Sequence, residues 1–318
     1  MLIIFTASVK IVFIITICHT IIMDFEEKKY WVGFSCCEGI GPQRFALLRS
    51  YFGSAQAAFW ASRRQLVATG LRPELIDFLV TFRKKFNFDS YFLRLKRLKI
   101  TVITSEEENY PVMLKEITGP PFVLYVKTDQ IGLIGQIFSL KAIAIVGTRT
   151  MTAYGREVTE KFTRALVKRG FVIVSGLARG VDRVAHETAL AAGGKTIAVC
   201  GTSLETVYPS EHWPLAEKIA ASGALISEYP LRAKIKRANF AIRDRLISGL
   251  SRGVLVTEAA EGSGTMITAG FAAEQGRDVF AVPGPVTSPL SAGTAMLIKK
   301  GAKLVYNIED ILEEIKLN

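Results

Sequence analysis

Cysteine and histidine are scarce in this chain of 318 residues, which contains four cysteines and three histidines. No two cysteines form a Cys-x-x-Cys pair, and the histidines (His19, His186 and His212) are scattered along the chain. Zinc sites are recognised by closely spaced ligands, so no metal site can be read from this sequence. The adjacent Cys36 and Cys37 are expected to be small buried residues of a reduced, cytosolic protein.

The sequence also lacks the fingerprints of the common nucleotide-binding enzymes. The run "AAGGKT" at 191–196 ends like a P-loop, but Ala189 stands where that motif needs a glycine, and its lysine leads into an expected strand. A Gly-x-Gly-x-x-Gly motif is missing too, because Gly147 stands alone before Thr148 and Arg149. We therefore expect no cofactor and no metal.

Acidic residues are outnumbered, with 29 Asp and Glu against 40 Lys and Arg, and the formal net charge is +11. Such an excess favours a polyanionic partner, either nucleic acid or an acidic membrane face. Hydrophobic residues make up 49% of the chain and charged residues 22%, a balance typical of a globular protein with one large or two moderate domains.

Residues 1–22 form an apolar segment about as long as a bilayer-spanning helix. They make a poor secretory signal, because no basic region precedes the apolar run and no small-residue cleavage site follows it. A membrane anchor would bury Lys10, at a cost on the order of 3 kcal/mol. A spurious extension before Met23 is the third interpretation, and Lys10 favours it. We expect a cytoplasmic protein, associated with a membrane only if residues 2–22 are a true anchor.

A helical domain is expected over residues 23–100. In "EGIGPQRFALLRSYFG", Gly39 and Gly41 precede Pro42 at a helix start, where free amides can hold a phosphate as in helix-hairpin-helix modules. A tight turn between packed helices is the alternative, and we favour it. The stretch 83–99 combines seven basic residues with interleaved aromatics, which can grip nucleic acid. An amphipathic helix with a solvated basic face is the preferred interpretation there.

Residues 101–318 alternate between apolar runs and helical patterns. The apolar runs suit strands buried on both faces, and they occur at 142–146, 171–175, 196–200, 224–227, 254–258 and 279–283. Helical patterns follow at 154–169, 182–192, 213–222, 239–250, 265–275 and 292–300. This repetition predicts an α/β fold with an open, doubly wound and mostly parallel sheet. Ligands of such sheets bind beyond the carboxyl ends of the strands.

Three of the expected strand-to-helix loops share glycines, small hydroxyl residues and free helix amides, and they read "IVGTRTMTAYG", "SGLARGVD" and "EAAEGSGTMITAG". Glycines let a ligand approach the backbone closely, and helix amides suit phosphate. Arg149 and Arg179 add positive charge to two of these loops. Together the loops predict an anion-binding cleft.

A fourth feature is the basic run between 231 and 251, where six basic residues accompany one acid, Asp244. If a helix starts with Asn239 as its N-cap, Phe240 lies on the first turn beside a basic loop. This pairing suits single-stranded nucleic acid, whose bases stack on aromatic rings while cations neutralise its phosphates. A core position for Phe240, with solvated charges around it, fits the residues equally well.

Support for catalysis is weak. Asp182 and His186 share a helical face, and such a pair more often serves helix packing than acid–base chemistry. Ser175 lacks the Gly-x-Ser-x-Gly surroundings of a nucleophile. Glu258, beside a glycine-rich loop, is the one residue that supports a general base and hence an enzyme.

These loops resemble those of the DprA (Smf) family of DNA-processing proteins. The matching pieces occur in order over about residues 143–305, and they include "IVGTR", "IVSGLARGVDRVAH", "TIAVCGTSLETVYP", "NFAIRDRLISGLS" and "VLVTEAAEGSGTMITAGFAAEQGRDVFAVPG". The resemblance implies an extended Rossmann-like domain, residues 101–318, after a small sterile-alpha-motif-like helical domain. It also implies a non-enzymatic homodimer that binds single-stranded DNA, protects incoming strands in natural transformation and loads RecA.

Carried over by motif, the resemblance implies phosphate contacts, a stacking ring, groove-lining arginines and a turn that closes the pocket. The phosphate contacts are Arg149, Gly176, Arg179, Gly180 and Lys236 or Arg237. Phe240 is the stacking ring, and Arg243 and Arg245 line the groove. The turn that closes the pocket consists of Ser263, Gly264 and Thr265.

The sequence departs from the family pattern at two places. The family usually reads Pro-x-Arg-Asn-Arg after the phenylalanine, whereas Ala241 and Asp244 replace the proline and the asparagine here. Asp244 is expected to weaken DNA binding unless it pairs with Arg243 or Arg245. The sequence also ends at Asn318 without the winged-helix-like tail of many members. The alternative function is a nucleoside-phosphate N-glycosidase of the lysine-decarboxylase-like group, although "AEGSGTMIT" departs from that group's Pro-Gly-Gly-x-Gly-Thr loop.

Overall fold

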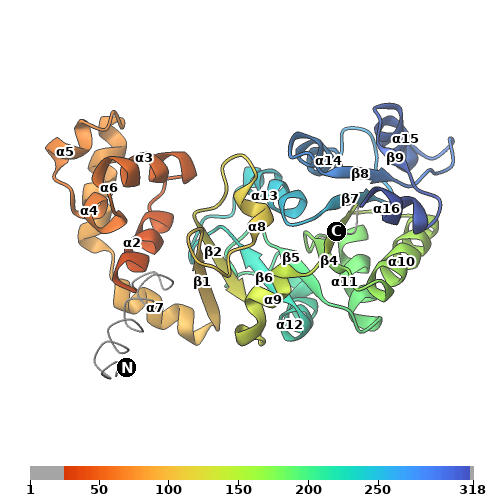
Figure 1. Cartoon of the computed structure of the whole chain (residues 1–318), viewed down its shortest axis with the longest axis horizontal. Coiled ribbons are helices and arrows are strands. Elements are labelled where there is room, and N and C mark those ends of the chain that lie inside the picture. Colours follow the sequence, from red (N-terminus) through yellow and green to blue (C-terminus); the bar gives the residue numbers. More distant parts are fainter. Residues whose placement is uncertain (1–24, 316–318) are drawn as a thin grey trace, which may run out of the picture.

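The computed structural model describes residues 25–315, in which a helical region precedes a large sheet flanked by helices (Figure 1). Residues 1–22, with their three interpretations, lie outside the described residues. Within the described range, no helix has both the length and the apolar character needed to cross a membrane.

The helical region owes its short helices to local start and stop signals. Pro42 stands in the first turn of its helix, where a missing amide costs nothing, and Gly53 ends that helix with a φ of 81°. Ser62 and Gln65 form a reciprocal capping box. The helices are α2 (Phe25–Cys36), α3 (Pro42–Phe52), α4 (Ala55–Trp60), α5 (Arg63–Val67), α6 (Pro73–Lys85) and α7 (Phe88–Arg97).

The strands of the described chain form one nine-stranded sheet in the order β1-β2-β6-β5-β4-β3-β7-β8-β9. The pairs from β6 to β9 are parallel, whereas β1–β2 and β2–β6 are antiparallel. The predicted doubly wound, mostly parallel sheet is therefore confirmed. The strands are β1 (Ile100–Thr104), β2 (Val123–Lys127), β3 (Ala142–Val146), β4 (Val172–Ser175), β5 (Thr196–Val199), β6 (Ala224–Ser227), β7 (Gly253–Val256), β8 (Asp278–Ala281) and β9 (Lys303–Leu304).

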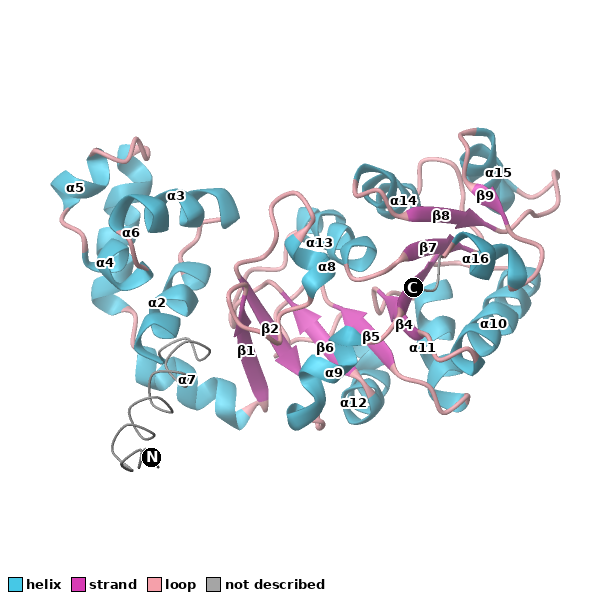
Figure 2. Cartoon of the chain, viewed as in Figure 1, coloured by secondary structure: helices cyan, strands magenta, loops and turns pink. Residues whose placement is uncertain are grey.

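Helices cover both faces of the sheet (Figure 2). One face packs against α10 (Ala153–Lys168), α11 (Val181–Ala191), α12 (Trp213–Ser222) and α16 (Glu309–Glu314). The other face packs against α8 (Val112–Lys115), α9 (Ile134–Ser139), α13 (Arg237–Gly249), α14 (Gly264–Glu274) and α15 (Ala292–Lys299). Single 3-10 turns lie at Ile131–Leu133, Ser210–His212 and Pro289–Ser291. Every residue of β3 is buried because its side chains alternate between two covered faces.

The predicted strands and helices of the sheet region agree with the structure to within two residues at each end. The sequence did not predict β1, whose short run follows directly on a basic helix. The predicted N-cap of α13 is wrong, because the helix begins at Arg237 and its N-cap is Lys236. Asn239 is instead buried on the first turn, where its side-chain amide donates to the carbonyl of Lys234.

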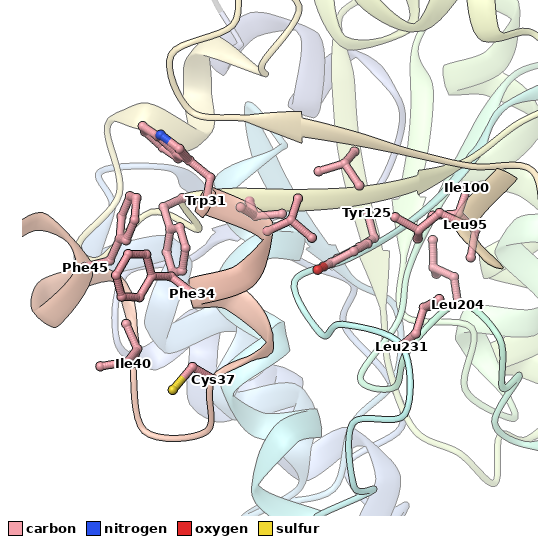
Figure 3. Packing of buried hydrophobic residues seen from close by; sticks show 14 of the residues in the cluster. Trp31, Phe34, Cys37, Ile40, Phe45, Leu95, Ile100, Tyr125, Leu204 and Leu231 are labelled. Carbon is pink, nitrogen blue, oxygen red and sulfur yellow. The ribbon is translucent and has the colours of Figure 1, made fainter. Parts of the chain in front are cut away.

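The helical region and the sheet share one hydrophobic core, although β1 begins at Ile100, next to the predicted domain boundary. Figure 3 shows Trp31, Phe34 and Phe45 from the helices near the strand residue Tyr125, and all four belong to this cluster. The Tyr125 hydroxyl lies 2.7 Å from that of Ser35. The core therefore holds the helices against the antiparallel end of the sheet.

Candidate nucleic-acid interface

The three glycine-containing loops meet at one edge of the sheet because β4, β3 and β7 are neighbours that run in parallel. The chain leaves β3 for α10 on one face and leaves β7 for α14 on the other. Open α/β sheets bind ligands at such a reversal, outside the carboxyl ends of the strands. We call this edge the carboxyl-edge site and define it by residues 147–152, 176–180 and 257–263.

Backbone hydrogen bonds fasten these loops to one another. The Thr148 amide donates to the Glu258 carbonyl over 2.8 Å, and the Val181 amide donates to the Thr148 carbonyl over 3.1 Å. Gly180 has a φ of 75°, and a Cβ at this position would stand 2.2 Å from the Thr148 oxygen. Only glycine fits, because a side chain is excluded both by the backbone conformation and by the close approach. Arg179 therefore projects from a fixed piece of backbone.

The predicted cationic phosphate contacts are accessible, whereas the predicted contact at Gly176 is corrected, because this residue is buried and its amide donates to Asp182. Arg179 is 66% exposed, and its Nε lies 2.7 Å from the Oε1 of Glu211. The Nζ of Lys236 lies 2.7 Å from the Oε1 of Glu38. Exposed ion pairs of this kind contribute little stability, so an incoming phosphate can replace either glutamate. Arg149 and Arg237 are exposed as well.

The structure corrects the expectation that Arg243 lines a groove. Its side chain is only 5% exposed. Its Nη1 donates to the carbonyls of Gly176 and Val199, and its Nε donates to Asp244 over 3.0 Å. Arg243 thus ties the loop after β4 to the end of β5 from inside the protein, and it positions the backbone that carries Arg179.

Arg245 also points inward, so its groove-lining role is corrected too. It pairs with Glu228, and each of the two side chains is 13% exposed. Burial raises the pKa of Glu228, although the charge of Arg245 opposes this shift. The pair links the end of β6 to α13.

Two buried carboxylates accompany the Arg243 guanidinium. Asp244 forms the ion pair that the sequence left open, and Asp182 accepts from the amides of Gly176 and Ala178 over 3.2 Å each. Burial raises the pKa of Asp182 and raises that of Asp244 to about 6, while Arg243 opposes both shifts. The negative charge of Asp244 is therefore directed at Arg243 inside the protein.

Phe240 is half-buried at the carboxyl end of β5. A Cβ on Gly201 would stand 2.7 Å from its ring, so glycine allows the ring to lie against the backbone. Tyr208 packs beside it, with ring centroids 5.2 Å apart, and is 55% exposed. Tyr208 was not predicted as a site residue, although it is the second-to-last residue of the run "TIAVCGTSLETVYP". Together the two rings form an aromatic platform beside the end of β5, the strand next to β4, and we include this platform in the carboxyl-edge site.

The turn that opens α14 contains three predicted site residues. Ser263 is the N-cap, Gly264 is exposed and Thr265 is buried. The Ser263 hydroxyl is buried and has no hydrogen-bond partner among the residues described. The role of this turn in closing a pocket stays a prediction.

Glu258, the one candidate for a general base, has structural partners, and so does His186. Both carboxylate oxygens of Glu258 accept from Thr152, from its hydroxyl over 2.7 Å and from its amide over 2.9 Å, which fixes the start of α10. The Nδ1 of His186 lies 2.7 Å from the Thr196 hydroxyl, so its partner is Thr196 and not Asp182. Burial lowers the pKa of His186 to about 3. Thr152 thus engages the Glu258 carboxylate within the carboxyl-edge site, and the His186 ring is fully buried.

A doubly wound, mostly parallel sheet covered by helices on both faces defines a Rossmann-like α/β protein. The chain belongs to the family of DNA recombination-mediator protein A, whose model matches residues 101–316. It is a DNA-processing protein of this family.

Named relatives agree with this assignment. The chain is 38% identical to Protein Smf of Synechocystis over 293 residues, which cover 91% of this chain and 73% of that protein. It is 43% identical to DNA processing protein DprA of Bacillus subtilis over 216 residues, covering 68% of this chain and 71% of that protein.

Two solved structures share the fold. The X-ray structure of DprA from Streptococcus pneumoniae superposes with a TM-score of 0.78 at 32% identity, covering 94% of this chain and all of that one (100%). DprA from Helicobacter pylori, described with a unique single-stranded DNA binding mode, superposes with a TM-score of 0.60 at 32% identity, covering 68% and 94% of the two chains.

Proposed function

We propose that this protein binds single-stranded DNA at the carboxyl-edge site without sequence preference and transfers the strand to RecA. The observation that carries the proposal is the exposed Arg179, fixed by Gly180, in the same loop cluster that Arg243 joins to the end of β5. Cations there neutralise phosphates, and the Phe240–Tyr208 platform offers a stacking surface for a base.

Three further observations support the proposal. The formal net charge of +11 suits a polyanionic partner. The family is that of a recombination mediator, and a relative of the same fold binds single-stranded DNA. The engagement of Glu258 with Thr152 supports a non-enzymatic role over the N-glycosidase alternative. In this role the protein acts as a cytoplasmic homodimer that protects strands taken up in transformation.

Replacing Arg179 by alanine is expected to weaken binding of an oligothymidylate of about twenty nucleotides by roughly threefold to tenfold. The slope of log affinity against log salt should become shallower by about 0.7, because one phosphate contact is lost. Fluorescence anisotropy with the full chain at several salt concentrations measures both quantities.

Wild-type protein should also accelerate the assembly of RecA on single strands coated with a single-strand-binding protein.

Arg164→Ala is the matched control for this variant. Arg164 is an exposed arginine in the second half of α10 that pairs with Glu160. Its replacement removes the same charge away from the carboxyl edge and should leave the salt slope unchanged. Equal effects of the two variants, or equal affinity of the wild type for duplex and single strand, would overturn the proposal.

Phe240→Ala is expected to reduce the affinity for single strands by about 1–3 kcal/mol, or roughly 5- to 150-fold, if a base stacks on this ring. Phe240→Tyr retains a ring and should bind nearly as well. Both variants need a thermal unfolding curve beside the binding curve, because the ring also packs on Gly201. Full affinity in a folded Phe240→Ala variant would show that no base stacks there.

A further inference from the structure

A cleft of about 790 Å³ lies between the helical region and the loop that joins β6 to α13. One wall is the glycine turn at 39–41 with the end of α6 and the start of α7, and the other is residues 228–239. Figure 3 shows Cys37 and Ile40 coming from the helical side and Leu231 from the loop side. We call this space the interdomain cleft; its size is that of a typical ligand site.

The lining of the interdomain cleft is strongly basic. Six lining residues are cationic and two are acidic. Of the acids, Glu228 is held by the buried Arg245, and Glu38 is held by Lys236. The excess of positive charge selects a polyanion. The six cations are Arg44, Lys85, Arg94, Arg232, Lys234 and Lys236.

The cleft also presents aromatic side chains among these cations. Phe86, which joins α6 to α7, lines it together with Tyr91 and Tyr229, and all three are half-buried. Lys85 and Phe86 belong to the basic, aromatic stretch 83–99, for which the sequence favoured a solvated helix face. In the structure Arg83 donates to the carbonyls of Phe59 and Ala61, whereas Lys85 borders the cleft. Cations beside aromatic rings are the combination that binds single strands.

Hydrogen bonds hold the two walls of the cleft together. The Tyr91 hydroxyl of α7 accepts from the Leu231 amide of the opposite loop over 3.0 Å and donates to the Tyr125 hydroxyl over 3.2 Å. A cleft whose walls are already joined requires little ordering when a ligand enters.

We infer that the interdomain cleft is a second subsite for the same single strand, holding the sugar-phosphate backbone of nucleotides beyond those at the carboxyl-edge site. Lys236 connects the two places, because it lines the cleft and occupies the N-cap position of α13, the helix that carries Phe240 on its first turn. The inference rests on the proposed function, since it extends the path of the strand. A phosphate that reaches Lys236 replaces Glu38 as its partner.

The test compares Lys85→Ala with Lys84→Ala in the full chain. The two lysines are adjacent and exposed, but only Lys85 is among the residues that line the cleft. Anisotropy is measured with oligothymidylates of about six and about twenty nucleotides, lengths that bracket the site sizes of small single-strand binders. Lys85→Ala should weaken binding of the long strand by roughly threefold to tenfold and flatten its salt slope by about 0.7, with little effect on the short strand. Lys84→Ala should match the wild type with both strands.

Glu38→Gln is expected to change the affinity for the long strand in the opposite direction. It removes the partner of Lys236 and an acid from the cleft, so the long strand should bind more tightly. In addition, a long strand containing bromodeoxyuridine should form photo-crosslinks to the peptide that contains Phe86 or to that containing Tyr229.

Failure of this inference is distinguishable from failure of the proposed function. If the long strand binds and Arg179→Ala weakens it, but Lys85→Ala and Lys84→Ala behave alike, the cleft is not a subsite. Crosslinks confined to the Phe240 peptide would overturn the inference in the same way. If the wild type binds neither strand, the proposed function itself is wrong and the cleft inference falls with it.

Discussion

Replacing Arg243 by methionine is expected to lower the free energy of unfolding by about 3–5 kcal/mol, the range for removing one partner of a buried charge cluster. The variant leaves Asp182 and Asp244 buried without their cation and removes the donor for the Gly176 and Val199 carbonyls. Urea unfolding followed by circular dichroism measures the change.

Arg164→Met is the control for this variant, because it makes the same substitution at an exposed ion pair. Its effect should stay within about 0.5 kcal/mol. The comparison also tests the structural role assigned to Arg243. If Arg243→Met were as stable as the control and had lost only DNA binding, Arg243 would be a DNA contact, as the resemblance first implied.

Replacing Asp244 by asparagine is expected to stabilise the protein at neutral pH by about 1–3 kcal/mol, since each pKa unit corresponds to about 1.4 kcal/mol. Burial raises the pKa of Asp244 to about 6, above its ordinary value of 3.8, so the folded state favours the protonated carboxyl. The stability from this group is present below about pH 4 and is lost as the pH rises through about 6. Asparagine stays neutral throughout, and Asp182 remains to balance Arg243.

The measurement is the difference in unfolding free energy between wild type and Asp244→Asn across this pH range. The difference should be small near pH 4, grow up to about pH 6 and stay constant above it. Glu228 is a buried acid common to both proteins and cancels in the difference. A variant that is less stable at neutral pH would show that the Arg243–Asp244 ion pair is net stabilising.

The order and type of the elements in the sheet region were predictable because the pattern is strong. Strands such as β3 are covered on both faces, so they read as continuous apolar runs, and the glycine loops between them mark strand ends. The position of Gly180 was also correctly singled out, but its reason is a contact with Thr148, which lies in another loop. The strand β1 was missed, although its five residues, Ile-Thr-Val-Ile-Thr, are all β-branched, a composition typical of strands.

The candidate site was predictable only in part. Arg179 lies in a glycine-rich motif and Arg243 in a basic motif, and both were predicted to contact DNA. In the structure Arg179 is exposed and Arg243 is buried. The carbonyls of Gly176 and Val199 and the carboxylate of Asp244 surround the Arg243 guanidinium. The two carbonyls come from β–α units other than that of Arg243, and a sequence motif does not show which distant groups will surround its side chains.

The sequence by itself determined the doubly wound order of strands and helices, the three glycine loops and the membership of the family, since each depends on local composition and spacing. Only the tertiary structure decided which cations face solvent, that Tyr208 joins Phe240, and that Lys85 and Lys234 border one cleft. The physical reason is that exposure and convergence depend on packing between segments far apart in the chain. In this protein the shared core around Trp31 and Tyr125 brings those segments together.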